Sequence, residues 1–467
     1  MVRVVSEPQT EIWSLRQIAK IVGGELCGED QKLFHITQDS RSCQKGSFFI
    51  PIQERRDGHD FAQDAFARGA VGAFWSSDKP WPDGMSVVRV DDSFQALKQL
   101  AQASVDRHKG LRIAITGSVG KTTTKDMLAF LLSPFVNVYA ADKSFNNHLG
   151  VPLSLVNMPV SAKCAIFELG MNHAGEIRPL AEMVKPQFGL VTMIAPAHIE
   201  QLGSLEGIAR EKREIFAPLQ RSDLAFVPID SPMCEILQEN ITSQMVTFGS
   251  SAEAVYQCVP AHTHHGKMSV TIRQPGHTTT CQLEFMAPHL CGSIAAAMAV
   301  GDQLKIEFKS LVDRLVRFSL PKGRGRVHNL EAPVPFVLID DAYNANPSSL
   351  HAAMDVLSLY EGRKIVVFGD MLELGEATQD AHIDAVRRIA KDGIDIALLL
   401  GSHFAEAAMK LGMQMVNVCA DPHHAWKWLE ENLEPQDVVL IKGSHASNVH
   451  EVVDHFINPS SRTGLVS

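Results

Sequence analysis

The chain has 467 residues, of which 45% are hydrophobic and 21% are charged, and its formal net charge is −10. These values exclude a collagen, a coiled coil and a wholly disordered chain, and the acidic balance argues against a protein that wraps nucleic acid. A length of about three usual domain sizes predicts about three domains.

Nothing in the sequence indicates a membrane or export segment. No apolar run approaches the roughly 18 residues that a membrane-spanning helix needs, and residues 1–8 lack the apolar stretch of a signal peptide. The 8 cysteines include no C-x-x-C pair, so they predict neither a zinc knuckle nor a redox pair. We therefore expect a reduced, cytoplasmic protein that does not span a membrane.

Residues 1–108 predict a small α/β domain. Helical spacing covers 14–22, which ends before two glycines, and also 93–108. Short apolar runs at 47–51 and 71–75 are typical of strands. We place the end of this first domain at the Lys-Gly pair that follows the second helix.

Residues 109–319 predict a central domain with a parallel sheet. An apolar strand at 111–116 leads through a glycine-bearing turn to a helix at 121–132, and a further strand is expected at 189–195. Alternation of strand and helix implies parallel strands. The stretch 222–286 shows strand patterns without a long helix, so we expect it to form a β-rich flank of this domain.

Residues 320–467 predict a third domain, again of alternating α/β type. Its expected strands and helices alternate along the chain, with strands at 336–340, 364–369, 395–400 and 437–442 and helices at 347–360, 379–391 and 424–432. This order is typical of a doubly wound, Rossmann-like sheet. It contains no G-x-G-x-x-G, so nothing indicates a nicotinamide cofactor. The predicted fold class is therefore α/β with three domains.

The strongest local motif is T-G-S-V-G-K-T-T-T at 116–124. A predicted strand enters it and a predicted helix leaves it, so the glycines let backbone N–H groups approach phosphate oxygens at a helix N-terminus. Lys121 supplies a positive charge beside the terminal phosphates, and the Thr122 hydroxyl can ligate Mg²⁺. The general pattern has a glycine where this chain has Ile115, so the loop is a shorter variant. The alternative is a chance glycine-rich turn, and the strand–loop–helix context favours the nucleotide interpretation.

Two polar side chains follow predicted strands of the same domain. Glu168 ends a strand at 164–169, and His198 follows the strand at 189–195. Because the carboxyl ends of parallel strands line the ligand crevice, these side chains can hold a metal beside a nucleotide. From the pattern alone, a capped strand end and an ordinary loop histidine stay open as alternatives.

Three further polar patterns are less specific. Lys212 lies in the charged stretch 206–216, whose spacing alone predicts a solvated helix face. The segment D-D-A-Y-N-A-N-P at 340–347 crowds acids and amides at a strand end, which indicates a binding site, with a turn and an Asn N-cap as the alternative. The histidines at 262–265 and 423–424 are predicted to be surface residues.

The motifs together resemble the Mur ligases of bacterial peptidoglycan synthesis. They occur in one order along the chain: the phosphate loop, S-F-N-N-H-L-G-V-P-L at 144–153, F-E-L-G-M-N at 167–172, A-H-I-E at 197–200, E-K-R-E-I-F at 211–216, D-D-A-Y-N-A-N-P at 340–347, G-D-M-L-E-L-G at 369–375 and K-G-S at 442–444. The N-terminal D-S-R at 39–41, F-F-I-P at 48–51 and D-G-H-D-F at 57–61 are similar to the UDP-binding domain of that family.

The resemblance implies an ATP-dependent amide ligase. In such a reaction ATP phosphorylates the terminal carboxylate of UDP-N-acetylmuramoyl-tripeptide, and the amine of D-alanyl-D-alanine attacks the acyl phosphate. The dipeptide is implied by Y-N-A-N-P and G-D-M-L-E-L-G. By the same resemblance, the first domain binds the UDP-sugar peptide, the central domain binds ATP, and the third domain binds the amine substrate and closes on ATP.

Family similarity also implies a set of site residues. The expected catalytic residues are Lys121, Lys212 and His198. The expected ligands of Mg²⁺ are Thr122, Glu168, His198 and Lys212, the last as a carbamate derived from CO₂. The expected ATP-binding residues are Gly117, Ser118, Val119, Gly120, Lys121, Thr122, Thr123, Arg326 and Asp341. The expected substrate-binding residues are Ser40, Arg41, Asn146, Asn147, Tyr343, Asn344 and Asn346.

Two positions depart from the family pattern. Family members carry H-N-x-x-N, whereas this chain has His289-Leu290-Cys291-Gly292-Ser293 and so lacks the amide that reads adenine. The family's K-G-S-R ends here in His445, which cannot offer a guanidinium fork. Two alternatives therefore stay open beside the dipeptide ligase: a related ATP-dependent ligase with a different amine or acyl acceptor, and a nucleotide-binding relic of such an enzyme.

Overall fold

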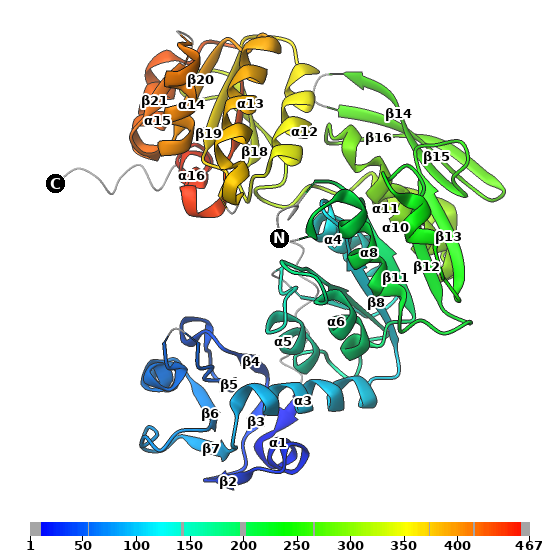
Figure 1. Cartoon of the computed structure of the whole chain (residues 1–467), viewed down its shortest axis with the longest axis vertical. Coiled ribbons are helices and arrows are strands. Elements are labelled where there is room, and N and C mark those ends of the chain that lie inside the picture. The colour runs from blue at the N-terminus through cyan, green and yellow to red at the C-terminus, as the bar shows by residue number, and fades with distance from the viewer. Residues whose placement is uncertain are drawn as a thin grey trace.

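The computed structural model describes residues 11–54, 56–141, 144–196, 202–264, 267–372, 374–413 and 416–458. Within these residues the chain forms three large sheets, and we name the N-terminal, central and C-terminal units after them. Figure 1 shows the N-terminal unit at the bottom, the central unit to the right and the C-terminal unit at the top left. The predicted α/β class is confirmed.

The N-terminal unit contains a sheet that has five strands among the described residues, in the order β2-β7-β6-β5-β4. All of its neighbours are parallel except the pair β2 and β7. Its elements are β1 (Trp13–Ser14), α1 (Leu15–Val22), β2 (Glu25–Cys27), β3 (Lys32–Leu33), β4 (His35–Thr37), β5 (Ser47–Phe49), α2 (Ala62–Ala67), β6 (Ala70–Trp75), β7 (Ser86–Arg89) and α3 (Ser93–Arg107). Both predicted helices and both predicted strands are present, and β1 pairs separately with β3.

The central sheet has nine strands within the described part of the chain, in the order β16-β15-β14-β13-β12-β11-β8-β10-β9. They are β8 (Leu111–Thr116), β9 (Val138–Ala140), β10 (Cys164–Glu168), β11 (Phe188–Val191), β12 (Leu224–Pro228), β13 (Gln244–Gly249), β14 (Tyr256–His264), β15 (Lys267–Gln274) and β16 (His277–Leu283). The expected β-rich flank is an extension of this sheet, in which β15 and β16 run antiparallel. Strand β11 ends at Val191 rather than at 195, because the chain turns there toward the phosphate loop.

Helices cover both faces of the central sheet. They are α4 (Lys121–Leu132), α5 (Gly150–Val156), α6 (Ile177–Val184), α8 (Leu205–Arg213), α9 (Cys234–Gln238), α10 (Cys291–Gln303) and α11 (Phe308–Leu315). Helix α4 packs against α10 in one apolar core, whereas α5, α6 and α8 share another core with the N-terminal unit. Every residue of α5 is buried, so it lacks the amphipathic spacing that a sequence search can detect.

The C-terminal sheet has six strands among the described residues, in the order β17-β18-β22-β19-β20-β21, and only β17 is antiparallel to its neighbour. The elements are β17 (Arg326–Leu330), β18 (Phe336–Asp341), α12 (Pro347–Ser358), β19 (Lys364–Gly369), α13 (Thr378–Lys391), β20 (Ile396–Leu400), α14 (Ser402–Leu411), β21 (Val416–Cys419), α15 (Pro422–Asn432), β22 (Val438–Lys442) and α16 (His450–Ile457). All four predicted strands and all three predicted helices of this unit are present.

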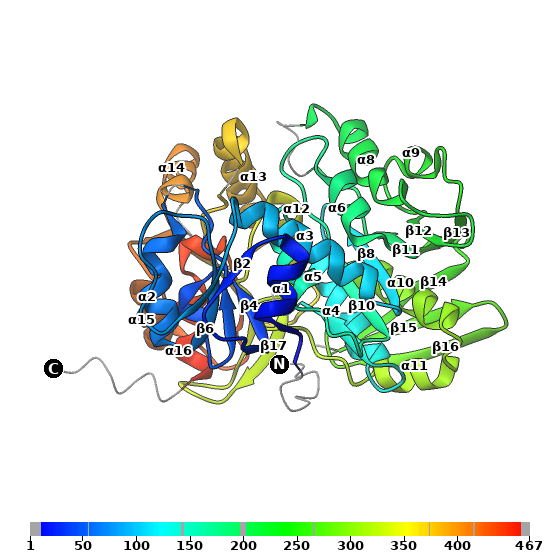
Figure 2. The same cartoon turned by 90° about the horizontal axis from the view of Figure 1, so that it is seen from below.

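The units are joined in different ways. The N-terminal and central units share an apolar core, and both views show α3 beside α5 (Figures 1 and 2). The Trp13 indole donates to the Val156 carbonyl at 2.9 Å, which ties the two units by a buried hydrogen bond. The C-terminal unit packs its apolar side chains in separate cores on the two faces of its own sheet, and Met286 of the central unit joins one of them. No helix in the described residues is long and apolar enough to cross a membrane.

Candidate active site

The predicted phosphate loop connects β8 directly to α4. Gly117 and Gly120 have φ values of +150° and +83°, a region that glycine adopts without strain. A Cβ on Gly117 would lie 1.9 Å from Thr192 Oγ1, so only glycine fits at this position. Thr192 Oγ1 donates to the Val119 carbonyl at 2.6 Å, and the Ser118 N–H donates to the Met193 carbonyl at 2.8 Å. The chain after β11 therefore holds the loop in shape.

The N-terminus of α4 and Lys121 make this loop suited to phosphate. No side chain in the described residues caps α4, whose first backbone N–H groups have no partner within the helix. Lys121 Nζ donates to the Gly117 carbonyl at 2.7 Å and lies 3.4 Å from the Ser118 carbonyl. Burial lowers the pKa of Lys121, and the nearby Glu168 carboxylate opposes that shift.

Oxygen-bearing side chains line one edge of the loop. Thr122 Oγ1 donates to Glu168 Oε2 at 2.9 Å, and Asn146 Nδ2 donates to Glu168 Oε1 at 2.8 Å. Glu168 is only 4% exposed, at the end of β10. A hydroxyl and a buried carboxylate are hard oxygen donors of the kind that Mg²⁺ prefers. The structure thus brings together three of the predicted residues, while His198 lies outside the described residues.

Lys212 is buried, which contradicts the solvated helix face that spacing alone predicts. Its exposed fraction is 2%, because the side of α8 formed by Ile208, Ala209, Glu211 and Lys212 packs inward. Burial, followed by repulsion from Lys121, holds the pKa of Lys212 well below its ordinary value. The neighbouring Glu211 accepts the N–H groups of Gly175 at 2.8 Å and Ile177 at 2.9 Å, which anchors α8 to the start of α6.

The 340–347 segment is held at the end of β18 by buried polar contacts. Lys442 Nζ, 2% exposed, lies 2.6 Å from Asp341 Oδ2 and 3.1 Å from the Asn344 carbonyl. Asn346 Oδ1 accepts the Ser349 N–H at 2.9 Å and caps α12, as the turn interpretation expects. Tyr343 and Asn344 are exposed.

An arginine that is not among the predicted site residues reaches the phosphate loop. Arg326 is exposed at the start of β17, whereas Arg324 Nη2 lies 3.5 Å from Thr122 Oγ1. The guanidinium carbon of Arg324 also lies 4.0 Å from the centre of the Tyr343 ring. The only local signal is the basic run K-G-R-G-R at 322–326, which does not distinguish its two arginines.

The residues predicted to bind the UDP-sugar peptide lie at the carboxyl end of β4. Ser40 is buried and its side chain helps to lower the pKa of the Asp64 carboxyl, while the exposed Arg41 pairs with Asp39 at 2.9 and 3.0 Å. A separate cavity of about 320 Å³ opens where β5, β6 and β7 end. His148 and Leu149 of the central unit complete its wall, so two units form this cavity.

The residues that depart from the family pattern make defined contacts. Leu290 is buried, and Ser293 Oγ accepts a hydrogen bond from Thr124 Oγ1 at 2.9 Å, which joins α10 to α4. The His445 ring lies nearly parallel to the Tyr343 ring, with centroids 6.3 Å apart. Asn147 Oδ1 accepts the Gly150 N–H at 2.8 Å and thereby positions the start of α5.

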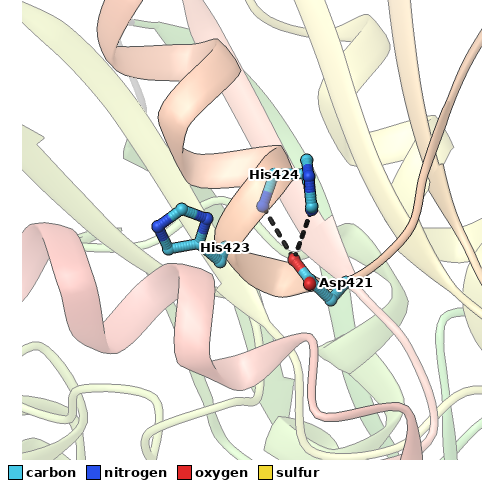
Figure 3. Close-up of side chains that lie close together, drawn as sticks. All are labelled: Asp421, His423 and His424. Carbon is cyan, nitrogen blue, oxygen red and sulfur yellow. Dashed lines mark hydrogen bonds and ion pairs between the residues drawn. The ribbon is translucent and has the colours of Figure 1, made fainter.

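The histidines at 423–424 are exposed, as expected. With Asp421 they bring their possible ligand atoms within 4.8 Å of one another (Figure 3). Asp421 Oδ1 accepts the His424 N–H at 2.9 Å and faces His424 Nδ1 at 2.8 Å, so this group is explained as the N-cap of α15. The side chains at 262–265 lie outside the described residues.

Known proteins match nearly the whole length of this chain. The Mur ligase middle domain matches residues 115–301, and the Mur ligase, glutamate ligase domain matches residues 325–445. The UDP-N-acetylmuramoyl-tripeptide–D-alanyl-D-alanine ligase of Bacillus subtilis is 32% identical over 455 residues, which cover 95% of this chain and 98% of the relative. The enzyme of the same name from Escherichia coli is 32% identical over 94% of this chain and 97% of its own length.

Solved structures agree with these relatives. The crystal structure of MurF from Acinetobacter baumannii has a TM-score of 0.83 and 28% sequence identity, and the match covers 96% of this chain and 99% of that one. MurF ligase from Thermotoga maritima, solved in complex with ADP, shares the fold with a TM-score of 0.76 at 24% identity, covering 90% of this chain and 96% of that one. The chain therefore belongs to the Mur ligase family.

Proposed function

We propose that this chain is an ATP-dependent ligase that joins D-alanyl-D-alanine to UDP-N-acetylmuramoyl-tripeptide during cytoplasmic synthesis of peptidoglycan precursors. The observation that carries the proposal is the junction of the phosphate loop with the buried Glu168 carboxylate. It occurs in a chain that matches relatives with the name of this ligase over nearly its full length.

The chemistry explains why the site needs clustered charges. An oxygen of the tripeptide's terminal carboxylate attacks the γ-phosphorus of ATP, and ADP leaves. The amine nitrogen of D-alanyl-D-alanine then attacks the acyl carbon, the carbon–oxygen bond to phosphate breaks, and the nitrogen loses a proton. Lys121 and the backbone N–H groups of residues 119–123 stabilise the charge on the transferring phosphoryl group, while the Ser118 N–H stays bonded to the Met193 carbonyl. Gly117, Ser118, Val119, Gly120 and Thr123 belong to this cradle.

The donor set at the edge of the loop fits Mg²⁺. The Thr122 hydroxyl and the Glu168 carboxylate are hard oxygen donors 2.9 Å apart. The ion would neutralise part of the phosphate charge, and we propose His198 as a further ligand. Asn146 keeps Glu168 oriented through its 2.8 Å hydrogen bond, so it supports this edge without needing to touch the ion.

We assign Lys212 to a carbamate. Its lowered pKa favours the neutral amine, whose lone pair attacks CO₂; a nitrogen–carbon bond forms and a proton leaves. The product places an anion near Lys121, so the two groups attract each other, whereas a protonated Lys212 would repel that cation. Oxygens of the carbamate are also ligands of the kind that Mg²⁺ prefers.

The outer units supply the remaining contacts in this proposal. Tyr343 and Asn344 are exposed at the end of β18, where they can contact D-alanyl-D-alanine or the nucleotide. Asp341 and Arg326 approach ATP from the C-terminal unit, while the Asn346 side chain acts first as a helix cap. Ser40, Arg41 and Asn147 contact the UDP-sugar peptide or shape its site, and the cavity beside His148 is suited to part of that substrate.

The test is a phosphate-release assay combined with mass measurement of the product. Purified chain is incubated with ATP, Mg²⁺, UDP-N-acetylmuramoyl-tripeptide and D-alanyl-D-alanine, and each component is omitted in turn. We expect stoichiometric phosphate and a dipeptide-extended product only in the complete mixture. Faster turnover with a different amine or acyl acceptor would support the related-ligase alternative, and nucleotide binding without any turnover would support the relic.

A further inference from the structure

Four side chains from two units form a closed circuit at the edge of the phosphate loop. Arg324 Nη2 lies 3.5 Å from Thr122 Oγ1, and that hydroxyl lies 3.0 Å from Ser144 Oγ. Ser144 Oγ is 3.4 Å from the Tyr343 hydroxyl, and the Tyr343 ring lies 4.0 Å from the guanidinium carbon of Arg324. Arg324 and Tyr343 belong to the C-terminal unit, whereas Thr122 and Ser144 belong to the central unit.

Backbone hydrogen bonds hold together the two segments that carry Arg324 and Tyr343. The Gly323 N–H donates to Asp340 Oδ2 at 2.7 Å, and the Tyr343 N–H donates to the Gly323 carbonyl at 3.1 Å. Gly323 has a φ of +76°, and a Cβ there would lie 2.9 Å from Tyr343 Cβ. The segment before β17 therefore lies directly against the segment after β18, and a movement of either carries both side chains.

An arginine suits this place better than a lysine. A flat guanidinium can lie over an aromatic face and donate hydrogen bonds from its edge at the same time, which a single ammonium group cannot do. The charge also lies close to the loop, since Arg324 Nη2 is 3.5 Å from Thr122 Oγ1 at the start of α4. Met286 of the central unit packs into one apolar core of the C-terminal unit, and polar contacts of this kind add to that packing in setting the position of the unit on the loop.

We propose that Arg324 is a positioning residue for the ligation, which holds Tyr343, on the amine-substrate side, in register with Thr122, on the nucleotide side. The inference rests on the proposed function and adds a residue to it, because the site expected from family similarity contains Arg326 and not Arg324. In this role Arg324 couples the placement of the two substrates, so its removal weakens the use of both.

The first test compares Arg324→Ala and Arg324→Lys with a matched control. Lys322→Ala removes a cation two positions away whose side chain is 55% exposed and pairs with Asp454. We expect Arg324→Ala to raise KM for both ATP and D-alanyl-D-alanine by about fivefold, the size of one solvent-exposed cation–π contact, with a smaller fall in kcat. Arg324→Lys should recover part of the loss, and Lys322→Ala should match the unmodified chain.

The second test does not depend on turnover. Small-angle scattering of the nucleotide-free chain should show a larger radius of gyration for Arg324→Ala, because the C-terminal unit loses its contact with the loop. If Arg324→Ala matched Lys322→Ala in both KM values and in radius, the proposal would be overturned. Should Arg324→Ala fail to fold, Arg324→Lys and Ser144→Ala test the same circuit. Raised KM values and a larger radius would support the proposal, and values equal to those of Lys322→Ala would overturn it.

A double-mutant cycle separates this proposal from the proposed function. Within one circuit, Ser144→Ala should add little to Arg324→Ala in the affinity for a non-hydrolysable ATP analogue, whereas independent sites would give additive losses. Additive losses would overturn the circuit. Failure of the unmodified chain to ligate the dipeptide would instead overturn the proposed function, and the scattering and affinity measurements on Arg324 would still decide the circuit.

Discussion

The phosphate loop and helix α8 each bring a lysine with a lowered pKa to the site, but they do so at different levels of structure. Lys121 Nζ is held by the Gly117 and Ser118 carbonyls, within its own turn of chain. Lys212 is 2% exposed because α8 packs the side that carries it inward, and none of the hydrogen bonds among the described residues involves its Nζ. A local motif therefore encodes the first lysine, whereas tertiary packing creates the environment of the second.

The largest expected effect is that of Lys121→Ala. The transferring phosphoryl group loses a preorganised charge, so we expect kcat/KM to fall by about 10² to 10³. The melting temperature should change little, because Lys121 is half-buried and the hydrogen bonds of its amine among the described residues go to its own loop. Phosphate-release kinetics and thermal unfolding measure the two quantities. Near-normal turnover would show that Lys121 is not a catalytic residue.

Lys212 tests the other half of the comparison. We expect Lys212→Ala to lower ligation by about 10², with partial recovery in acetate or propionate, which restores an anion in the emptied space. Lys212→Arg should stay inactive, because a guanidinium remains positive and forms no carbamate. Turnover is measured with and without added bicarbonate. Full activity of Lys212→Arg would show that this buried lysine is structural.

Gly117→Ala tests whether the loop geometry depends on its neighbour strand. The new Cβ would lie 1.9 Å from Thr192 Oγ1 at a φ of +150°, so we expect KM for ATP to rise about tenfold and the melting temperature to fall. Thr192→Ala in the same chain should recover part of the stability. Gly276→Ala is the control, since Gly276 has a φ of +77° with nothing within 4 Å and reports strain alone.

The smallest expected effect is a pH dependence of stability from Lys212. Its folded pKa lies below the ordinary 10.5, so between the two values the unfolded chain binds a proton that the folded chain does not. Stability relative to Lys212→Met should therefore rise with pH across that interval, by at most about 1.4 kcal/mol per pH unit. Denaturant unfolding in CO₂-free buffer measures it. A constant difference between the two chains would mean that Lys212 is not buried as a free amine.

Much of the fold follows from local pattern. Strand β8 and helix α4 occupy the predicted residues, because an apolar run, a glycine turn and a helix start lie next to one another in the sequence. Helix α5 was missed, since a helix buried on every side has no polar face to give it a period. Strand β17 was missed because an edge strand with two of its five residues exposed and none fully buried carries a weak apolar pattern.

The site residues also fall into two groups, those that local sequence pattern predicts and those that it does not. Thr122 and Glu168 are predictable because strand ends and phosphate loops have known places in a parallel sheet. Arg324 is not, because its contact with Thr122 spans 202 positions and depends on how the C-terminal unit sits on the loop. Asn346 shows the reverse difficulty, since its place in a family motif predicts a substrate contact while its oxygen caps α12.

By itself, the sequence determined the α/β class, the phosphate loop with Lys121 and Thr122, and the resemblance to a ligase family, because each depends on residues close together in the chain. Only the tertiary structure decided that Lys212 is buried, that Glu168 lies against Thr122 and that Arg324 reaches the loop. The physical reason is that burial and charge–charge contact arise between elements far apart in sequence, and no local spacing records them.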